Sequence, residues 1–396
     1  MEANKYKLKS NIVKNYIFIF LNRLDLTQGV WMIYLAVKGM SLTQLGILEG
    51  IFHLTSFCME VPTGVVADLW GRKISRILGR AFSFIGTIVL IFSNNFYMFA
   101  LSFAISAISY NLESGAGDAL IYDSLKEIGK EEEYMKVNGN KEMFMQIGTL
   151  VALPLGGYLA AKNYLLPFVL SAVIACITLV QAVSFVEPDI HREKGGNKKV
   201  LNLLKTQVVD SVKVIKNNKK VGFFIVFINV ISLFITTLFY YLQNYWKVQG
   251  HSEFKIGIYL SISSLLAGIM ATKVYKLERI LKEKGILVFM PFIIILALWG
   301  IALTDYSPIF YVVIGIADSI AYVTISDYIN KLIPSENRAT ILSFESMVFS
   351  FLMIFIFPLI GKIGDAISLN FAFKVMAGIG TIMVLWNTYV LKTTDR

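Results

Sequence analysis

The chain has 396 residues, of which 56% are hydrophobic and 16% are charged, and its formal net charge is +10 at pH 7. A soluble domain carries about 25% charged residues, so this composition excludes an ordinary soluble enzyme and a disordered chain. The basic residues lie in short segments between apolar stretches, which indicates membrane topology rather than a nucleic-acid partner.

Apolar runs of membrane-spanning length, about 20 residues each, recur along the whole chain. In chain order they cover 16–36, 42–66, 76–93, 96–122, 143–161, 164–186, 221–243, 256–274, 286–303, 307–329, 340–360 and 370–391. The sequence therefore predicts an all-α membrane protein with twelve transmembrane helices.

The amino-terminal stretch has the basic character of a signal peptide, but Arg23 and Asp25 break the following apolar run and no small-residue cleavage site follows. We therefore predict a retained first span. Basic residues in short loops stay on the cytoplasmic side. With the amino terminus inside, the outer loops hold only Lys38, Lys162, Lys247, Lys255 and Lys362. Both termini are therefore expected in the cytoplasm.

A long polar segment follows the sixth span and divides the chain into two halves of six spans. The halves repeat weakly at an offset of 200 to 204 residues: Gly-Ala-Gly-Asp at 115–118 matches Gly-Ile-Ala-Asp at 315–318, and Pro-Leu-Gly-Gly at 154–157 matches Pro-Leu-Ile-Gly at 358–361. Transporter folds are often built from such internal repeats. The two cysteines, Cys58 and Cys176, lie in apolar stretches, so no disulfide framework is expected.

The segment after the second span reads Gly64-Val65-Val66-Ala67-Asp68-Leu69-Trp70-Gly71-Arg72-Lys73. It resembles the signature loop of the major facilitator superfamily, Gly-x-x-x-Asp-Arg-x-Gly-Arg-Arg/Lys, with Leu69 in place of the first arginine. The resemblance implies a conformational latch formed by Gly64, Asp68, Gly71, Arg72 and Lys73. Gly64 would let two helices approach closely, and Arg72 and Lys73 would anchor the loop at the inner leaflet. The alternative is that the acidic and basic residues only end the helix.

Two further patterns are similar to those of the twelve-span drug/proton antiporter group. The fifth span, 148–157, resembles the antiporter signature Gly-Pro-x-x-Gly-Gly, but has Ala152 and Leu153 in place of Gly-Pro. In the fourth span, Asn111 stands where many proton-coupled members have arginine, so Glu113 and Asp118 are expected to take the ionic role of that span.

The resemblance implies the major facilitator fold, two pseudo-symmetric six-helix bundles. We predict an amino-terminal bundle over 1–190, a cytoplasmic linker over 191–220 and a carboxy-terminal bundle over 221–396. In this fold the first, fourth, seventh and tenth spans line a central cavity. The implied cavity residues are Asn22, Trp31, Tyr34, Tyr110, Asp118, Tyr240, Tyr241, Asp318 and Tyr322. Aromatic residues also form belts at membrane interfaces, which is the alternative for the tyrosines and tryptophans.

Ionisable residues inside spans are costly, so each is a functional hypothesis. Glu49, His53, Ser56 and Glu60 follow the spacing i, i+4, i+7 and i+11, which places them on one face of the second span. This polar stripe predicts either a proton pathway or a satisfied hydrogen-bond network between helices.

We predict Glu49, His53, Glu60, Asp25 and Glu113 as proton-coupling residues. Some of these acids are instead expected to form structural ion pairs, for which Arg23 and Arg80 offer the charges. Glu345, near the start of the eleventh span, has no assigned role.

The expected function is secondary active transport, the proton-coupled efflux of lipophilic or cationic small molecules by alternating access. The alternative is a metabolite symporter or uniporter of the same fold. No His-Glu-x-x-His, Gly-x-Ser-x-Gly or phosphate-loop motif occurs, so an enzyme is not expected, and neither is a cofactor or metal. The expected partners are a small-molecule substrate, protons and the lipid bilayer of a bacterial cell membrane, with the protein acting as a monomer.

Overall fold

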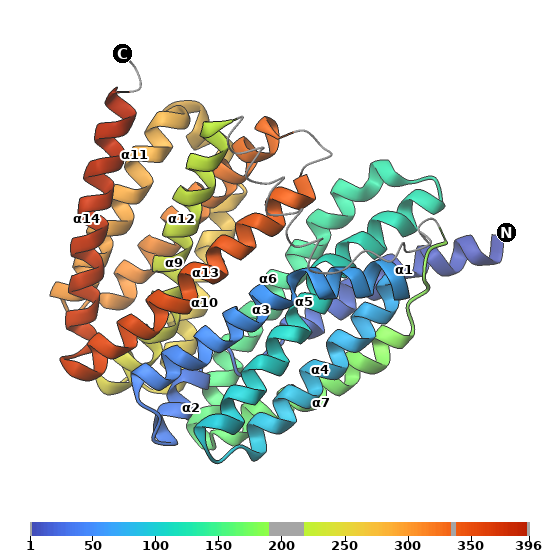
Figure 1. The fold of residues 1–396 in the computed structure, drawn as a ribbon, viewed down its shortest axis with the longest axis horizontal. Helices are drawn as coiled ribbons and strands as arrows, with labels where there is room; N and C mark the ends of the chain where they lie inside the picture. The colour runs from blue at the N-terminus through green and yellow to red at the C-terminus, as the bar shows by residue number, and fades with distance from the viewer. Residues whose placement is uncertain (1, 190–217, 334–337, 394–396) are drawn as a thin grey trace. The chain divides into compact units, whose positions relative to one another are not determined.

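The computed structural model describes residues 2–189, 218–333 and 338–393, which form long helices joined by short turns (Figure 1). The helices are α1 (Glu2–Arg23), α2 (Trp31–Val37), α3 (Leu42–Trp70), α4 (Arg72–Phe92), α5 (Phe96–Glu127), the 3-10 turn η1 (Glu131–Glu133), α6 (Tyr134–Lys162), α7 (Leu165–Val183), α9 (Lys219–Val248), α10 (Glu253–Ala271), α11 (Val274–Leu303), α12 (Ser307–Leu332), α13 (Arg338–Ala366) and α14 (Leu369–Thr393). No strand occurs in the described ranges.

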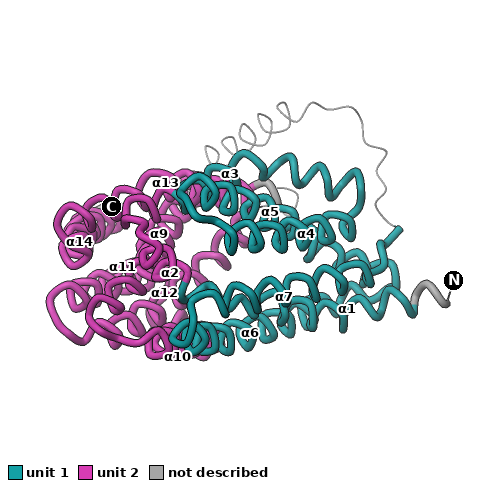
Figure 2. The backbone as a smooth tube through the Cα atoms, turned by 90° about the horizontal axis from the view of Figure 1, so that it is seen from below, with its two compact units in different colours: residues 1–30, 48–207 teal, residues 31–47, 208–396 magenta. Residues whose placement is uncertain are grey.

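The chain forms two compact units (Figure 2). Unit 1 comprises residues 1–30 and 48–207, and unit 2 comprises 31–47 and 208–396. Residues 31–47 lie within the range predicted for the amino-terminal bundle, 1–190, but belong to unit 2. Most of the linker predicted over 191–220 lies outside the described residues, so the predicted bundle boundaries stay predictions.

Close packing in unit 1 depends on small residues where α4 meets α5. The hydroxyl of Ser109 donates to the carbonyl of Gly79 at 2.8 Å, and that of Ser102 donates to the carbonyl of Gly86 at 2.8 Å. A Cβ on Gly86 would lie 3.0 Å from the Ser106 hydroxyl. Small residues and interhelical serine hydrogen bonds are how helices associate where no water is present to drive their packing. These contacts hold α4 and α5 close together.

The predicted first span, 16–36, is not one continuous helix, because α1 ends at Arg23 and α2 begins at Trp31. Asp25 starts the break: its Oδ1 accepts hydrogen bonds from the Thr27 amide at 3.0 Å and the Thr27 hydroxyl at 2.6 Å. Such local bonds from an aspartate compete with the helical ones and favour a turn. The mean hydropathy of residues 16–36 is compatible with one continuous span. The two hydrogen bonds that Asp25 accepts from Thr27 nevertheless favour a turn within it.

The segment between α1 and α2 packs against α6 and α7. Leu26 is 2% exposed, and its amide donates to the Ser171 hydroxyl at 3.1 Å. A Cβ on Gly156 would lie 2.1 Å from the Leu26 carbonyl oxygen, and one on Gly148 would lie 2.9 Å from the Phe20 carbonyl oxygen. Residues 148–157 of α6, which resemble an antiporter signature, therefore form a groove of small residues. The end of α1 and the segment that follows it pack into this groove.

Unit 2 is built around α12, which packs against α10 and α11, while α11 also packs against α14 (Figure 1). Trp246 of α9 is fully buried and donates its indole N–H to the Ser307 hydroxyl at 2.8 Å. Asp365, near the end of α13, accepts the amides of Leu42 and Thr43 at 2.9 and 2.7 Å. These bonds cap the first turn of α3, whose leading amides have no partner within the helix.

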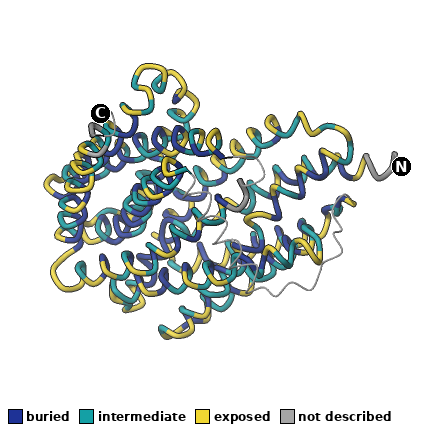
Figure 3. The backbone as a smooth tube through the Cα atoms, turned by 45° about the horizontal axis from the view of Figure 1, so that its top comes forward, coloured by how far each residue is buried: buried dark blue, intermediate teal, exposed yellow. Residues whose placement is uncertain are grey.

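Nine helices of the described residues are long and apolar enough to cross a membrane. Many large apolar residues are exposed, and exposed positions recur along the helices (Figure 3). The remaining helices predicted as spans are α1, α3 and α5. They carry many of the charged and polar residues that the sequence predicts to be functional, which lowers their mean hydropathy.

Candidate functional site

The polar stripe predicted on the second span lies on α3. The Nε2 atom of His53 lies 3.6 Å from Oε1 of Glu49, and each side chain is only 9% exposed. The Ser56 hydroxyl donates to Oδ1 of Asn111 on α5 at 2.7 Å, and the Asn111 amide donates to the Ser56 carbonyl at 2.6 Å. Glu60, further along the stripe, is half-buried. Asn111, at the position of the family's arginine, therefore ties α5 to α3.

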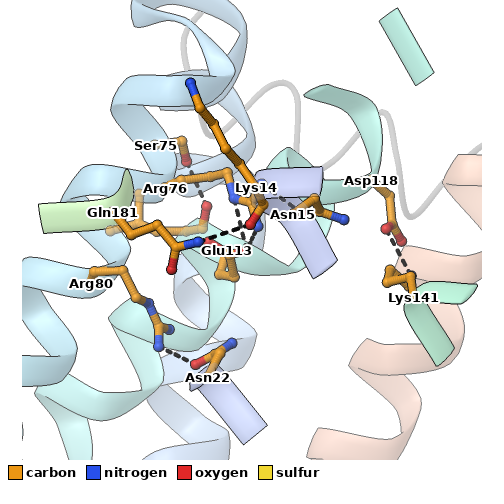
Figure 4. Close-up of polar contacts among 11 residues, drawn as sticks. Lys14, Asn15, Asn22, Ser75, Arg76, Arg80, Glu113, Asp118, Lys141 and Gln181 are labelled. Carbon is orange, nitrogen blue, oxygen red and sulfur yellow. Dashed lines mark hydrogen bonds and ion pairs between the residues drawn. The ribbon is translucent and has the colours of Figure 1, made fainter. Parts of the chain in front are cut away.

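Glu113 of α5 forms a buried ion pair with Arg76 of α4 (Figure 4). The Nη2 and Nε atoms of Arg76 lie 2.9 and 3.0 Å from the same carboxylate oxygen, and Nη1 donates to Oδ1 of Asn15 on α1 at 3.0 Å. The guanidinium lies 4.1 and 4.6 Å from the ring centroids of Phe18 and Phe185, and the Arg76 side chain is 0% exposed. The pair holds α1, α4 and α5 together, a structural role that competes with the predicted proton-coupling role of Glu113.

A second arginine follows one turn later on α4. Arg80 is 7% exposed and donates to Oδ1 of Asn22 on α1 (Figure 4). Gln181 of α7 donates to the Lys14 carbonyl at 2.9 Å. Asn22, predicted as a cavity residue, therefore belongs to a row of polar contacts inside unit 1 that joins α1 to α4 and α7.

Asp25 lies in the break between α1 and α2 and is exposed, with Thr27 as its bonding partner. The predicted proton-coupling residues thus occupy separate surroundings: Glu49 and His53 contact each other, Glu113 is paired with Arg76, and Asp25 shapes a turn.

The predicted latch lies where α3 meets α4. Arg72 forms an ion pair with Asp123 of α5, and its Nη1 donates to the Ala119 carbonyl at 2.7 Å. Gly64 and Asp68 lie on an exposed side of α3, and a Cβ on Gly64 would meet nothing within 4 Å among the described atoms. The close approach at Gly64 stays a prediction, and Arg72 ties this segment to α5.

Glu187, just after α7, contacts the segment predicted as the latch. Its two carboxylate oxygens accept the backbone amides of Arg72 at 2.8 Å and Lys73 at 2.6 Å, at the positive end of α4. Gly71 has φ of 100°, and a Cβ there would lie 2.9 Å from the Glu187 carboxyl carbon. Glycine is required at this position both for its backbone conformation and for the approach of Glu187.

Three of the predicted cavity aromatics pack within unit 2. The Trp31 and Tyr240 ring centroids are 5.3 Å apart, and those of Tyr240 and Phe357 are 5.8 Å apart. Tyr241 is fully buried, and its hydroxyl lies 2.8 Å from the Phe357 carbonyl and 3.3 Å from the Leu42 carbonyl. Tyr241 therefore joins α9 to α3 and α13 and has a structural role in this conformation.

The other predicted cavity aromatics differ in exposure. Tyr34 of α2 is 2% exposed, whereas Tyr110 of α5 and Tyr322 of α12 are 59% and 51% exposed. Tyr110 lies beside Phe52 of α3, with ring centroids 6.0 Å apart. Of these three tyrosines, Tyr110 and Tyr322 have a large exposed surface.

The two aspartates of the repeat have different surroundings. The Asp118 side chain is 51% exposed, and its Oδ1 lies 2.8 Å from the Nζ atom of Lys141 on α6 (Figure 4). Asp318 of α12 has a fully buried Oδ1 atom with no hydrogen-bond partner, and it forms no ion pair with any described residue. Of the two predicted cavity aspartates, Asp318 is therefore the one without an ion-pair partner among the described residues.

No group of histidine, cysteine, aspartate and glutamate side chains in the described ranges could hold a metal ion. Cys58 and Cys176 are free thiols on exposed positions.

Arg76, Glu187 and Lys141 were not predicted as interaction partners of the predicted site residues. Arg76 precedes Arg80 by four residues, so the two share a helix face, and that spacing could have identified it. Lys141 and Glu187 lie in polar segments near predicted span ends, where the chain carries many other charges. Their pairing depends on which helices are neighbours, which a local pattern does not reveal.

Comparison with known proteins decides the family. The family model described as Major Facilitator Superfamily matches residues 16–358. The chain belongs to the Major Facilitator Superfamily. The family prediction is thereby confirmed, and so is the predicted all-α membrane fold.

Relatives within this superfamily include bacterial transporters. The uncharacterized MFS-type transporter YxaM of Bacillus subtilis is 25% identical over 382 residues, covering 93% of this chain and 92% of that protein. The quinolone resistance protein NorA of Staphylococcus aureus is 22% identical over 194 residues, covering 49% of this chain and 49% of NorA.

Solved structures of the superfamily match over almost the full length. The nucleoside transporter NupG has a TM-score of 0.79 at 14% identity, covering 96% of this chain and 99% of NupG. A D-xylose-proton symporter has a TM-score of 0.71 at 12% identity, covering 98% of this chain and 97% of the symporter. At these identities the likeness shows the fold alone.

Proposed function

We propose that this member of the Major Facilitator Superfamily is a secondary active transporter that couples the efflux of lipophilic or cationic small molecules to proton entry by alternating access. The observation that carries the proposal is the buried contact between Glu49 and His53 on α3. A carboxylate and an imidazole in contact form a unit whose net charge changes when one proton binds.

The charge change supplies a driving force for conformational switching. A charged side chain in the bilayer is costly unless it faces a partner or a water-filled cavity, so protonation alters which facing state is favoured. In this scheme a proton bound from outside neutralises the site, one facing state becomes favoured, and cytoplasmic substrate is carried out after the proton leaves. One elementary charge moving down 100 mV provides about 2.3 kcal/mol, equivalent to about fifty-fold in concentration.

Several observations support an exporter with a lipophilic cargo. NorA, whose name refers to quinolone resistance, is related over half of the chain. Tyr110 and Tyr322 offer exposed aromatic surface, which suits stacking and cation–π contacts. The bacterial relatives and the distribution of basic residues support a plasma-membrane location with both termini in the cytoplasm.

The test is transport in proteoliposomes against a panel of dyes and metabolites, with and without an imposed proton gradient. Wild-type protein is compared with Glu49→Gln, Glu60→Gln and Asp25→Asn, and Glu131→Gln on the exposed η1 turn serves as the matched control. We expect Glu49→Gln to abolish gradient-driven transport while downhill exchange persists, and Glu131→Gln to behave as wild type. Undiminished proton-driven transport in Glu49→Gln would remove the basis of the site assignment.

The same assay decides between the exporter and the metabolite symporter or uniporter. A cargo that moves only down its own gradient, unaffected by protons, identifies a uniporter. A metabolite that accumulates on the side to which protons flow identifies a symporter. Expulsion against a gradient, with protons moving the opposite way, supports the antiport proposed here.

A further inference from the structure

The first two turns of α11, residues 274–281, form a short helix of their own in unit 2. Lys282 has φ of 55° and ψ of 180°, which is outside the helical region, so a kink separates these residues from the span that follows. Thr272 and Lys273 form a turn that separates them from α10. The segment therefore lies between the α10 span and the α11 span without continuing either of them.

The corresponding turn of unit 1 is built differently. In the order of spans, the connection of α10 to α11 corresponds to that of α3 to α4. α3 has 29 residues and joins α4 through Gly71 alone, whereas α10 has 19 residues and ends before the separate segment. Gly71 and Lys282, the residues just before the two following spans, both have positive φ. The break between α10 and residues 274–281 is thus particular to unit 2.

One face of the segment is fixed against other helices of unit 2. Oε1 of Glu278 accepts a hydrogen bond from the Tyr328 hydroxyl of α12 at 2.9 Å. Oε1 of Glu283, just beyond the kink, lies 2.8 Å from Nζ of Lys220 on α9. Val274, one turn before Glu278, is 4% exposed. Both acids of this stretch are therefore engaged within the unit.

The opposite face carries exposed basic residues beside exposed apolar ones. Residues 275, 276, 279 and 280 share this face, because side chains three and four positions apart lie on one side of a helix. Tyr275 and Ile280 are 56% and 76% exposed. Nζ of Lys276 and the guanidinium carbon of Arg279 lie 5.9 and 5.8 Å from the Tyr275 ring centroid. Four exposed basic residues of the segment and its ends form no ion pair with a described carboxylate: Lys273, Lys276, Arg279 and Lys282.

Unit 1, in contrast, supplies acids to its own basic turn. Arg72 is paired with Asp123, and Glu187 accepts the amides of Arg72 and Lys73. The four basic residues of unit 2 have no such acid among the described residues. A cluster of basic residues just outside a membrane span is typical of segments that bind anionic lipid headgroups. Exposed aromatic and aliphatic side chains on the same helix face add contact with the membrane interface.

We propose that the basic segment 273–282 binds acidic phospholipid headgroups of the cytoplasmic leaflet. The predicted topology places the turn between the eighth and ninth spans on that side, where the leaflet has a negative surface potential. The basic side chains contact lipid phosphates, and Tyr275 and Ile280 enter the boundary between headgroups and acyl chains. The inference goes beyond the proposed function, because lipid binding requires neither a proton nor a cargo.

The experiment titrates purified full-length protein in a neutral detergent with short-chain phosphatidylglycerol and measures binding by microscale thermophoresis. Phosphatidylcholine of the same chain length, which has no net charge, is the reference lipid. The deciding variant is Lys276→Gln with Arg279→Gln. A second variant, Lys273→Gln with Lys282→Gln, repeats the test at the ends of the segment, and thermal unfolding in detergent alone reports whether each variant is folded.

The matched control is Lys126→Gln with Lys136→Gln. It removes two exposed positive charges of unit 1 that lie on either side of the acidic η1 turn. The control therefore has the same change in net charge as each segment variant, at a place where neighbouring acids disfavour an anionic lipid.

We expect wild type to bind phosphatidylglycerol about tenfold or more tightly than phosphatidylcholine, and added NaCl to reduce that preference, because salt screens exposed charges. Each segment variant should weaken phosphatidylglycerol binding about tenfold, and the control should leave it within about twofold. Equal binding of the two lipids by wild type would overturn the inference, as would equal losses in the folded segment variants and the control. A loss confined to the segment variants would uphold it, whether or not wild type couples efflux to protons.

Discussion

Asp118 in unit 1 and Asp318 in unit 2 end the same Gly-x-x-Asp pattern, yet one is half exposed and paired with Lys141 and the other has a buried oxygen without a partner. Unit 1 contains the ion pairs of Arg76 with Glu113 and of Arg72 with Asp123, all between different helices. Unit 2 also has an ion pair between helices, Lys220 of α9 with Glu283 of α11, but its side chains are 49% and 34% exposed.

The comparison indicates that charged residues have different roles in the two repeated halves. In unit 1 charges fix neighbouring helices, because a buried charge with a well-placed partner resists any movement that would separate them. In unit 2 the corresponding aspartate has a buried oxygen without a hydrogen-bond partner.

Arg76→Met tests whether the buried pair of unit 1 is structural. The change leaves Glu113 buried without its cation, and removing one partner of a buried pair costs about 3–5 kcal/mol. We expect a large fall in the free energy of unfolding, measured by denaturant titration in detergent. The double variant Arg76→Met with Glu113→Leu should recover most of the loss. A single variant as stable as wild type would show that the pair contributes nothing to the unit.

Gly156→Ala tests the close packing of α6 against the segment between α1 and α2. A Cβ there would lie 2.1 Å from the Leu26 carbonyl oxygen, so the backbone of the break must move. Overpacking of this kind costs about 1–3 kcal/mol. Gly115→Ala is the matched control, since a Cβ at Gly115 meets nothing within 4 Å among the described atoms. Equal melting temperatures for the two variants would argue against the close approach.

Glu187→Gln tests how the latch is held. The amide keeps one acceptor oxygen for the amides of Arg72 and Lys73 but loses the charge that favours the positive end of α4, and such capping interactions are worth about 0.5–2 kcal/mol. We expect a modest fall in stability together with faster limited proteolysis between α3 and α4. Glu131→Gln, on the exposed η1 turn, should change neither quantity.

Asp118→Asn and Asp318→Asn give the smallest effects but opposite signs. The exposed pair of Asp118 with Lys141 contributes about 0–1 kcal/mol, so its loss should lower the melting temperature slightly. Replacing the unpartnered Asp318 carboxylate by an amide removes the cost of burying a charge, so the melting temperature should rise. Destabilisation by Asp318→Asn would mean that this carboxylate has a structural partner after all.

Much of the fold could be predicted because it follows from properties that repeat along the chain. Apolar runs of bilayer length, the segment 64–73 and the internal repeat are local patterns, and they were sufficient for the family and the helical architecture. The break after Arg23 was not predicted, because hydropathy averages over a window whereas Asp25 interrupts the helix through two specific hydrogen bonds to Thr27.

Local patterns were enough to identify the unusual residues: acids and a histidine on one face of the second span, arginines in apolar surroundings, and aspartates at equivalent places in the two halves. Their partners became known only from the packing of the helices, which joins Glu113 to Arg76, Asn111 to Ser56 and Asp118 to Lys141. A charge inside a membrane protein is stabilised by groups from other helices. Those helices come together only when the chain folds.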